Sequence, residues 1–125
     1  MEYLLTIPGK LHNLNDYISA ERSNRYVGAQ MKKADQSIII HYAKKQLRGI
    51  SIEKPVFMEY TWYEAGRQRD KDNISSFGRK VIQDGLVMAH VLRGDGWEHI
   101  EGFSDRFEVD RKNPRIEILI REVEV

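Results

Sequence analysis

PVFMEYTWYE, residues 55–64, is a run of ten residues that begins with proline and is rich in large side chains. Every second position holds a large apolar residue: Val56, Met58, Tyr60 and Trp62. Successive side chains of a strand point to opposite faces of the sheet, so the stretch predicts a strand that opens at Pro55. The face with Tyr60 and Trp62 is expected either to enter the core or to form a dimer interface.

A helix is predicted on each side of this strand. The upstream helix runs from about Val27 to Leu47 and ends before Gly49, a natural helix stop. The downstream helix runs from about Asn73 to Met88. Its apolar stripe, at spacings of three, seven and eight residues, consists of Ile74, Phe77, Val81 and Ile82.

The two ends of the chain predict further strands. Residues 3–7 alternate and stop at Pro8-Gly9, and residues 10–24 are expected to form a loop with a helical turn near Asn15. DRFEVD (105–110) and RIEILIREV (115–123) predict a closing hairpin, with Asp105 and Asp110 on its surface. The predicted order is β-α-β-α-β-β. It defines one small α/β (α+β) domain over residues 1–125, a mixed sheet flanked by helices.

Composition narrows the class of protein. The chain is 41% hydrophobic and 31% charged with a net charge of +1, which is typical of a globular domain and does not by itself indicate a nucleic-acid binder. It has no cysteine, which excludes disulfides and thiolate chemistry. The first residues lack a charged leader, and no apolar run reaches the roughly 20 residues of a membrane span. A cytoplasmic protein is expected.

RQRDKDNISSFGRK, residues 67–80, places five basic side chains around Asp70 and Asp72. If residues 67–72 continue the extended run, the two carboxylates lie side by side and repel one another unless a cation intervenes. Mg²⁺ suits such a pair because it prefers oxygen ligands and keeps positions for water or phosphate. The alternative is a solvated loop in which Asp72 caps the helix beginning at Asn73.

Further polar residues follow at regular spacing. Lys80 and Asp84 are four residues apart and share a helix face, with Asn73 seven residues before Lys80 on nearly the same line. LRGDGWEHI, residues 92–100, then places Asp95 between two glycines in a turn that leads into the next strand.

This ordered set resembles the RusA-type Holliday-junction resolvases, including their phage-encoded relatives. The matching motifs are RDKDN at 69–73, KVIQDGL at 80–86 and GDGW at 94–97. IPGKLHNLNDYI near the start and GFSDRFEVDRKNPRIEILI, residues 102–120, are also similar to the phage branch of that family. The resemblance covers almost the whole chain.

The resemblance implies a Mg²⁺-dependent endonuclease, with Mn²⁺ as a possible substitute, that resolves four-way DNA junctions by paired phosphodiester hydrolysis. By position, Asp70, Asp72 and Asp95 match the family's metal-binding catalytic acids, and Lys80 matches its active-site lysine. About one extra helical turn separates Asn73 from Lys80, so Ser76 or Arg79 could fill the lysine position instead.

The resemblance also implies partners and a setting. A symmetric junction favours a C2 homodimer, and a bacterial or phage-infected cell is the expected host. The cations expected to draw the DNA backbone to the acids are Arg67, Arg69, Lys71 and Arg79.

A second basic group lies upstream and surrounds Tyr26. It consists of Arg22, Arg25, Lys32 and Lys33. It could bind phosphates while Tyr26 stacks on an unpaired base, or it could be a solvated loop and helix face. Two other functions stay open: a metal-dependent nuclease for other branched nucleic acids, and a non-catalytic DNA-binding module of the same fold.

Overall fold

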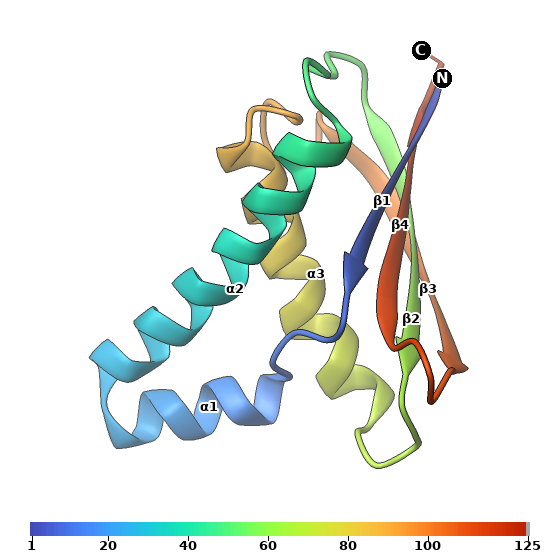
Figure 1. Cartoon of the computed structure of the whole chain (residues 1–125). Coiled ribbons are helices and arrows are strands. Elements are labelled where there is room, and N and C mark those ends of the chain that lie inside the picture. Colours follow the sequence, from blue (N-terminus) through green and yellow to red (C-terminus); the bar gives the residue numbers. More distant parts are fainter. Residues whose placement is uncertain (125) are drawn as a thin grey trace.

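Four strands form one mixed sheet, and three helices pack on one of its faces (Figure 1). The computed structural model describes residues 1–124. In chain order the elements are β1 (Glu2–Pro8), α1 (Leu14–Ser23), α2 (Arg25–Gln46), β2 (Val56–Glu64), α3 (Lys71–Met88), β3 (Ile100–Val109) and β4 (Arg115–Glu122). The predicted α+β class and the order of the strands and the two longer helices are confirmed. The helices that flank the sheet all lie on one side of it (Figure 1).

β2 lies inside the sheet, whose strand order is β1-β4-β2-β3. The alternation of residues 55–64 is confirmed, because Val56, Met58, Tyr60 and Trp62 are all fully buried. Neighbouring β4 and β1 contribute the same kind of side chain to this face: Leu5, Ile7, Ile116, Ile118 and Ile120. The predicted alternative of a dimer interface on the Tyr60–Trp62 face is therefore wrong, since α3 and the core occupy it.

The predicted closing hairpin is wrong. β3 pairs with β2 in parallel, whereas β4 pairs antiparallel with both β2 and β1. A parallel neighbour requires a crossover, and α3 supplies it between β2 and β3. β4 has three buried isoleucines and takes an inner position, while most of β3 is exposed and lies at the edge. The alternating pattern identified both strands but not their neighbours.

α1 is a ten-residue helix where a loop with one helical turn near Asn15 was expected. Its start is fixed by a capping box, in which the Asn13 side chain accepts from the Asp16 backbone N–H and Asp16 accepts from that of Asn13. The Tyr17 ring stacks on Phe77 of α3 at 4.8 Å between centroids. The sequence contains a short helical spacing here, Leu14, Tyr17 and Ile18, and the helix is stabilised by its cap and by tertiary packing.

Two close approaches determine how α3 sits in the fold. A Cβ at Gly78 would lie 2.7 Å from the Trp62 ring, so the missing side chain lets α3 pack directly on β2. A Cβ at Gly85 would lie 2.6 Å from Cβ of Ile39, which brings α2 against α3. At both positions the absence of a side chain lets α3 pack closely against its neighbour.

The loop before α1 is attached to α2 through a buried carboxylate. Asp35 is only 2% exposed and accepts hydrogen bonds from the His12 backbone N–H and from His12 Nδ1, both at 2.9 Å. His12 thus has a structural role in this loop. Among the residues described, no helix is long and apolar enough to cross a membrane.

Candidate functional site

Asp70 and Asp72 lie at the beginning of α3. Asp70 is the N-cap residue, with no side-chain capping bond, and Asp72 is in the first turn. The extended run to residue 72 that would set the two carboxylates side by side does not form: β2 ends at Glu64, bends follow, and the helix begins at Lys71. Both acids are exposed. Acids at this end of a helix are favoured by the helix dipole, with or without a metal.

The Arg69 side chain makes structural contacts within the fold. Its Nε lies 3.0 Å from Glu64 Oε1, and its NH1 donates to the Leu11 carbonyl oxygen at 2.8 Å. Glu64 is itself buried. Arg69 therefore connects the end of β2 to the loop before α1, and is committed to that contact. Arg67 and Lys71, the other predicted DNA-binding cations of this stretch, are exposed.

Lys80 lies between two carboxylates that come from different segments. Its Nζ is 3.0 Å from Asp95 Oδ2 and 3.1 Å from Asp84 Oδ1. Asp84 belongs to the same helix, whereas Asp95 belongs to the loop between α3 and β3. Hydrogen bonding to Asp95, and then to Asp84, raises the pKa of Lys80, and the same contact lowers the pKa of Asp95. Lys80 and Asp95 therefore stabilise one another in their charged forms.

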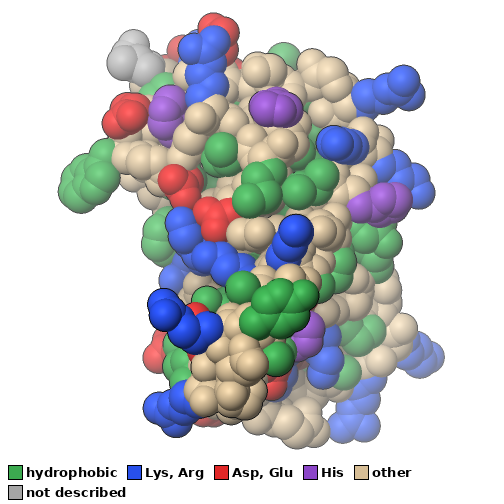
Figure 2. Space-filling view, turned by 90° about the vertical axis from the view of Figure 1, so that its left-hand side faces the viewer, with side chains coloured by type: hydrophobic (Ala, Val, Ile, Leu, Met, Phe, Trp, Pro, Cys, Tyr) green, Lys and Arg blue, Asp and Glu red, His purple; other side chains and the backbone are tan. Residues whose placement is uncertain are grey.

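α2 completes this cluster from the other side. Gln36 Nε2 donates to Asp84 Oδ2 at 3.2 Å, and Lys32 Nζ lies 3.8 Å from the same oxygen. Acidic and basic side chains lie against one another at mid-height on the helix-bearing side of the molecule (Figure 2). We call Lys32, Gln36, Lys80, Asp84 and Asp95 the Lys80 cluster. The K-x-x-x-D spacing signals part of it in the sequence, but nothing signals Gln36.

The three residues considered for the family's lysine position lie in different surroundings. Ser76 Oγ donates to the Asp72 carbonyl oxygen at 2.6 Å, within α3. Arg79 pairs with Asp105, which also accepts from Trp62 Nε1 at 2.9 Å, and its guanidinium lies 4.5 Å from the Phe103 ring centroid. Asp105, expected on a hairpin surface, is instead part of this half-buried contact. Lys80 is the one of the three that touches Asp95.

The predicted metal-binding acids do not come together. Asp95 contacts Lys80, ten residues along α3 from Asp70, which corresponds to about 15 Å of helix. Residues 1–124 contain no group of three or more His, Asp or Glu side chains that could hold a metal ion. In this arrangement the Lys80 ammonium occupies the position between carboxylates that a cation would take. Asp70, Asp72 and Asp95 therefore do not fit a single metal ion here.

The upstream basic residues are divided between two locations. Lys32 reaches the Lys80 cluster, whereas Arg22 and Arg25 lie at the exposed junction of α1 and α2. Lys33 is exposed on α2. Only Lys32 of this group is thus brought to the predicted catalytic lysine.

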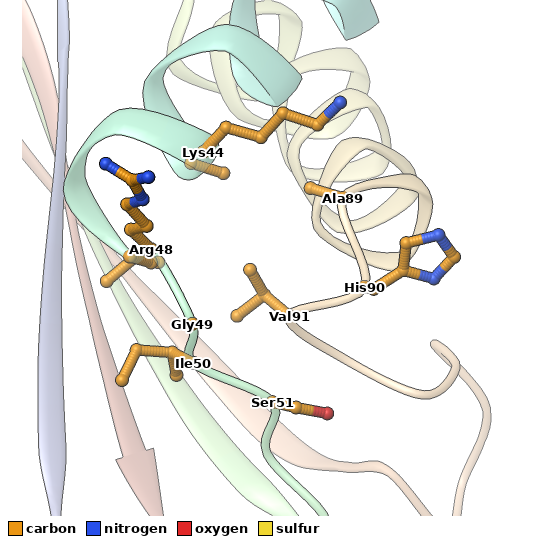
Figure 3. A pocket seen from close by; sticks show the side chains of 10 residues that line it. Lys44, Arg48, Gly49, Ile50, Ser51, Ala89, His90 and Val91 are labelled. Carbon is orange, nitrogen blue, oxygen red and sulfur yellow. The ribbon is translucent and has the colours of Figure 1, made fainter.

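A separate hollow of about 480 Å³ lies where α2 and α3 end (Figure 3). Lys44 and Arg48 line its α2 side, Val91 lies at its centre, and the His90 ring points away from it. None of the predicted site residues lines it.

No protein-family model matches the chain, and no curated protein matches its sequence.

Proposed function

We propose that the chain is an endodeoxyribonuclease that cuts branched DNA, with the four-way junction as its substrate and Mg²⁺, or Mn²⁺ in its place, as its metal. The observation that carries the proposal is the Lys80 cluster. Two elements of the ordered acid-and-lysine set, Lys80 and Asp95, come from separate segments and meet at 3.0 Å. A lysine held at a surface by acids is a positioned point charge.

Lys80 is suited to contact a phosphate. Its side chain is 54% exposed, so a phosphate oxygen can approach the ammonium while the carboxylates restrict its position. A fixed cation near a scissile phosphate stabilises the charge that develops in the transition state. Arg67, Lys71 and Lys33 are exposed cations that can hold the DNA backbone nearby.

The metal requirement is supported by the family resemblance and by the exposed carboxylates of Asp70 and Asp72. Because Asp70, Asp72 and Asp95 do not converge, no step of cleavage is assigned to a metal. The pair Asp70 and Asp72 remains exposed, and two carboxylates are a usual protein contribution to a Mg²⁺ site.

A homodimer is part of the proposal, since two symmetric cuts require two sites. The sheet face opposite the helices supplies a surface for it. This face carries half-exposed Leu4 and the Phe57 and Tyr63 rings, which lie under Arg121 and Arg115. No helix covers this face in Figure 1.

The test is to incubate the full chain with a four-way junction, a fork and a linear duplex, each with Mg²⁺, Mn²⁺ or EDTA. Paired nicks in the junction with Mg²⁺ or Mn²⁺, and none with EDTA, are expected. Preferential cutting of the fork would assign the chain to another branched-DNA substrate. Cutting of none of the three with either metal would contradict the nuclease proposal.

One observation favours a second candidate, a non-catalytic DNA-binding module. It is the separation of Asp95 from Asp70 and Asp72, which leaves no shared metal site within residues 1–124. This candidate is distinguished by gel shift: the chain would bind the junction in EDTA but would not nick it with either metal at any concentration at which it binds.

A further inference from the structure

The junction of α1 and α2 projects from the rest of the molecule (Figure 1). Residues 21–27 are all exposed, and we call them the tip. Tyr26 is 70% exposed and its neighbour Val27 is 44% exposed. A single exposed apolar residue is ordinary on a protein surface. Exposure alone therefore does not assign a binding role to Tyr26, and the charged residues around it must be considered.

The tip lies in a basic segment whose acids are already engaged. Residues 14–33 contain Arg22, Arg25, Lys32 and Lys33 against Asp16 and Glu21, a balance of four minus two, or +2. Asp16 belongs to the capping box of α1, and Glu21 accepts from the Tyr17 hydroxyl at 2.7 Å. Within residues 1–124, neither Arg22 nor Arg25 forms an ion pair. Their charges are free to bind an anion.

The tip is held in one shape by its own contacts. Asn24 ends α1 through its backbone N–H, and its side chain accepts from the Tyr26 backbone N–H at 2.7 Å to begin α2. A Cβ at Gly28 would lie 2.4 Å from Cγ of Glu21, so the two helices touch directly behind the tip. A pre-formed surface loses little conformational freedom when it binds.

A line of cations connects the tip to the Lys80 cluster. Arg25 and Lys32 are seven residues apart on α2, so they lie on one stripe of the helix, about 10 Å apart. Lys32 lies 3.8 Å from Asp84, which also contacts Lys80. Figure 2 shows exposed hydrophobic and basic side chains close together on the lower half of this side. A DNA backbone bound at the tip would thus run along these cations toward Lys80.

We propose that Tyr26 is a specificity-determining residue that stacks on an unpaired base at the branch point of DNA, while Arg22 and Arg25 hold the flanking phosphates. The proposal rests on the proposed function, since it assumes a nucleic-acid substrate. An exposed aromatic ring among free cations is the usual arrangement for binding bases that have left the duplex stack. A fully paired duplex offers the cations phosphates but offers Tyr26 no free base.

The experiment uses the full chain in EDTA, with a four-way junction that carries 2-aminopurine beside the branch point and a linear duplex as comparison. Tyr26→Ala is expected to weaken junction binding about 5- to 140-fold, the range for losing one stacked base. Duplex binding should not change. The change in 2-aminopurine fluorescence on binding should be lost, whereas Tyr26→Phe, which keeps the ring, should preserve it.

The arginines give an independent readout. Replacing both Arg22 and Arg25 with Gln should weaken binding to junction and duplex alike. It should also make the negative slope of log K against log salt shallower by about 2. Tyr26→Ala should leave that slope unchanged. Trp97→Ala is the matched control: this ring is also highly exposed, but Glu98 and Glu101 stand close to it in the sequence, and its loss should not alter the fluorescence signal.

The outcomes separate this inference from the proposed function. One outcome is that wild type nicks the junction with Mg²⁺ while Tyr26→Ala binds it and changes the 2-aminopurine fluorescence as wild type does. In that case the role of Tyr26 is refuted and the nuclease proposal stands. An equal loss for Trp97→Ala would also refute it. If wild type binds neither DNA in EDTA nor cuts either with Mg²⁺, both proposals are wrong. Circular dichroism confirms that the exposed substitutions leave the fold intact.

Discussion

Lys80 and Arg79 are neighbours in sequence with different tasks in the structure. Lys80 is half exposed and touches Asp84 and Asp95, whereas the Arg79 side chain is only 21% exposed and is held by Asp105 and Phe103. We expect Lys80→Ala to reduce junction cleavage about 100-fold, the cost of losing one transition-state donor, with little effect on the melting temperature. Gel-based cleavage rates and thermal melts measure the two effects.

Arg79→Ala should behave in the opposite way. Loss of its ion pair and its contact with the Phe103 ring should destabilise the fold by about 1–2 kcal/mol, while the surviving folded fraction cuts at a near-normal rate. Lys45→Ala, an exposed lysine outside both contacts, is the control for charge alone. Normal cleavage by Lys80→Ala together with loss in Arg79→Ala would show that Arg79 fills the family's lysine position.

Asp72→Asn separates a role in metal binding from a role at the helix end. Asn keeps the shape of the side chain but is a poorer Mg²⁺ ligand than a carboxylate. Nicking with Mg²⁺ should fall by about 100-fold, and junction binding in EDTA should persist or tighten because one charge that repels phosphate is gone. If Asp72 serves only the dipole of α3, the result is a loss of about 0.3–1 kcal/mol of stability with unchanged nicking.

The Lys80–Asp95 contact makes a prediction about titration. Since hydrogen bonding to Lys80 lowers the pKa of Asp95, the carboxylate should titrate below its ordinary value. The stabilisation is present above the ordinary pKa and is lost as the pH falls through the lowered one. Carboxyl carbon shifts in NMR should show this, and Lys80→Met should raise the pKa. Titration at the ordinary value in wild type would show that the ion pair is absent in solution.

At the scale of elements, the position of α3 depends on two glycines. Gly78→Ala would push a methyl group into Trp62, and Gly85→Ala would push one into Ile39. Each should destabilise the fold by about 1–3 kcal/mol through overpacking. Gly96→Ala is the control, because its Cβ would meet nothing closer than 3.9 Å. Chemical denaturation measures all three, and a stable Gly78→Ala variant would contradict the packing of α3 on β2.

The elements also show where sequence patterns are sufficient. β2, β4 and α3 were predictable because their apolar periods match the face they bury. α1 was missed because its formation depends on a cap and on Tyr17 stacking with Phe77, and the second of these is a tertiary contact. The hairpin prediction failed because alternation describes one strand and contains no information about its neighbour.

At the scale of the whole molecule, the open face of the sheet predicts the oligomeric state. Sedimentation at micromolar concentration should give twice the 14.7 kDa chain mass. Leu4→Glu, on the exposed edge strand of that face, should shift the protein toward monomer, because it places a charge where apolar surface would be buried. Leu4 faces away from the core, so the melting curve of the monomer should remain cooperative. A wild-type protein that sediments only as a 14.7 kDa species would contradict the dimer.

The sequence by itself determined the α+β class, the buried face of β2, the two longer helices and the K-x-x-x-D pair on α3, because each depends on residues close together in the chain. Only the tertiary structure decided that β3 and β4 lie on opposite sides of β2, that Arg69 donates to the Leu11 carbonyl oxygen, and that Asp95 meets Lys80 rather than Asp70. These contacts join segments far apart along the chain or at different heights of one helix. Their geometry follows from how α3 crosses the sheet, and no local spacing encodes that path.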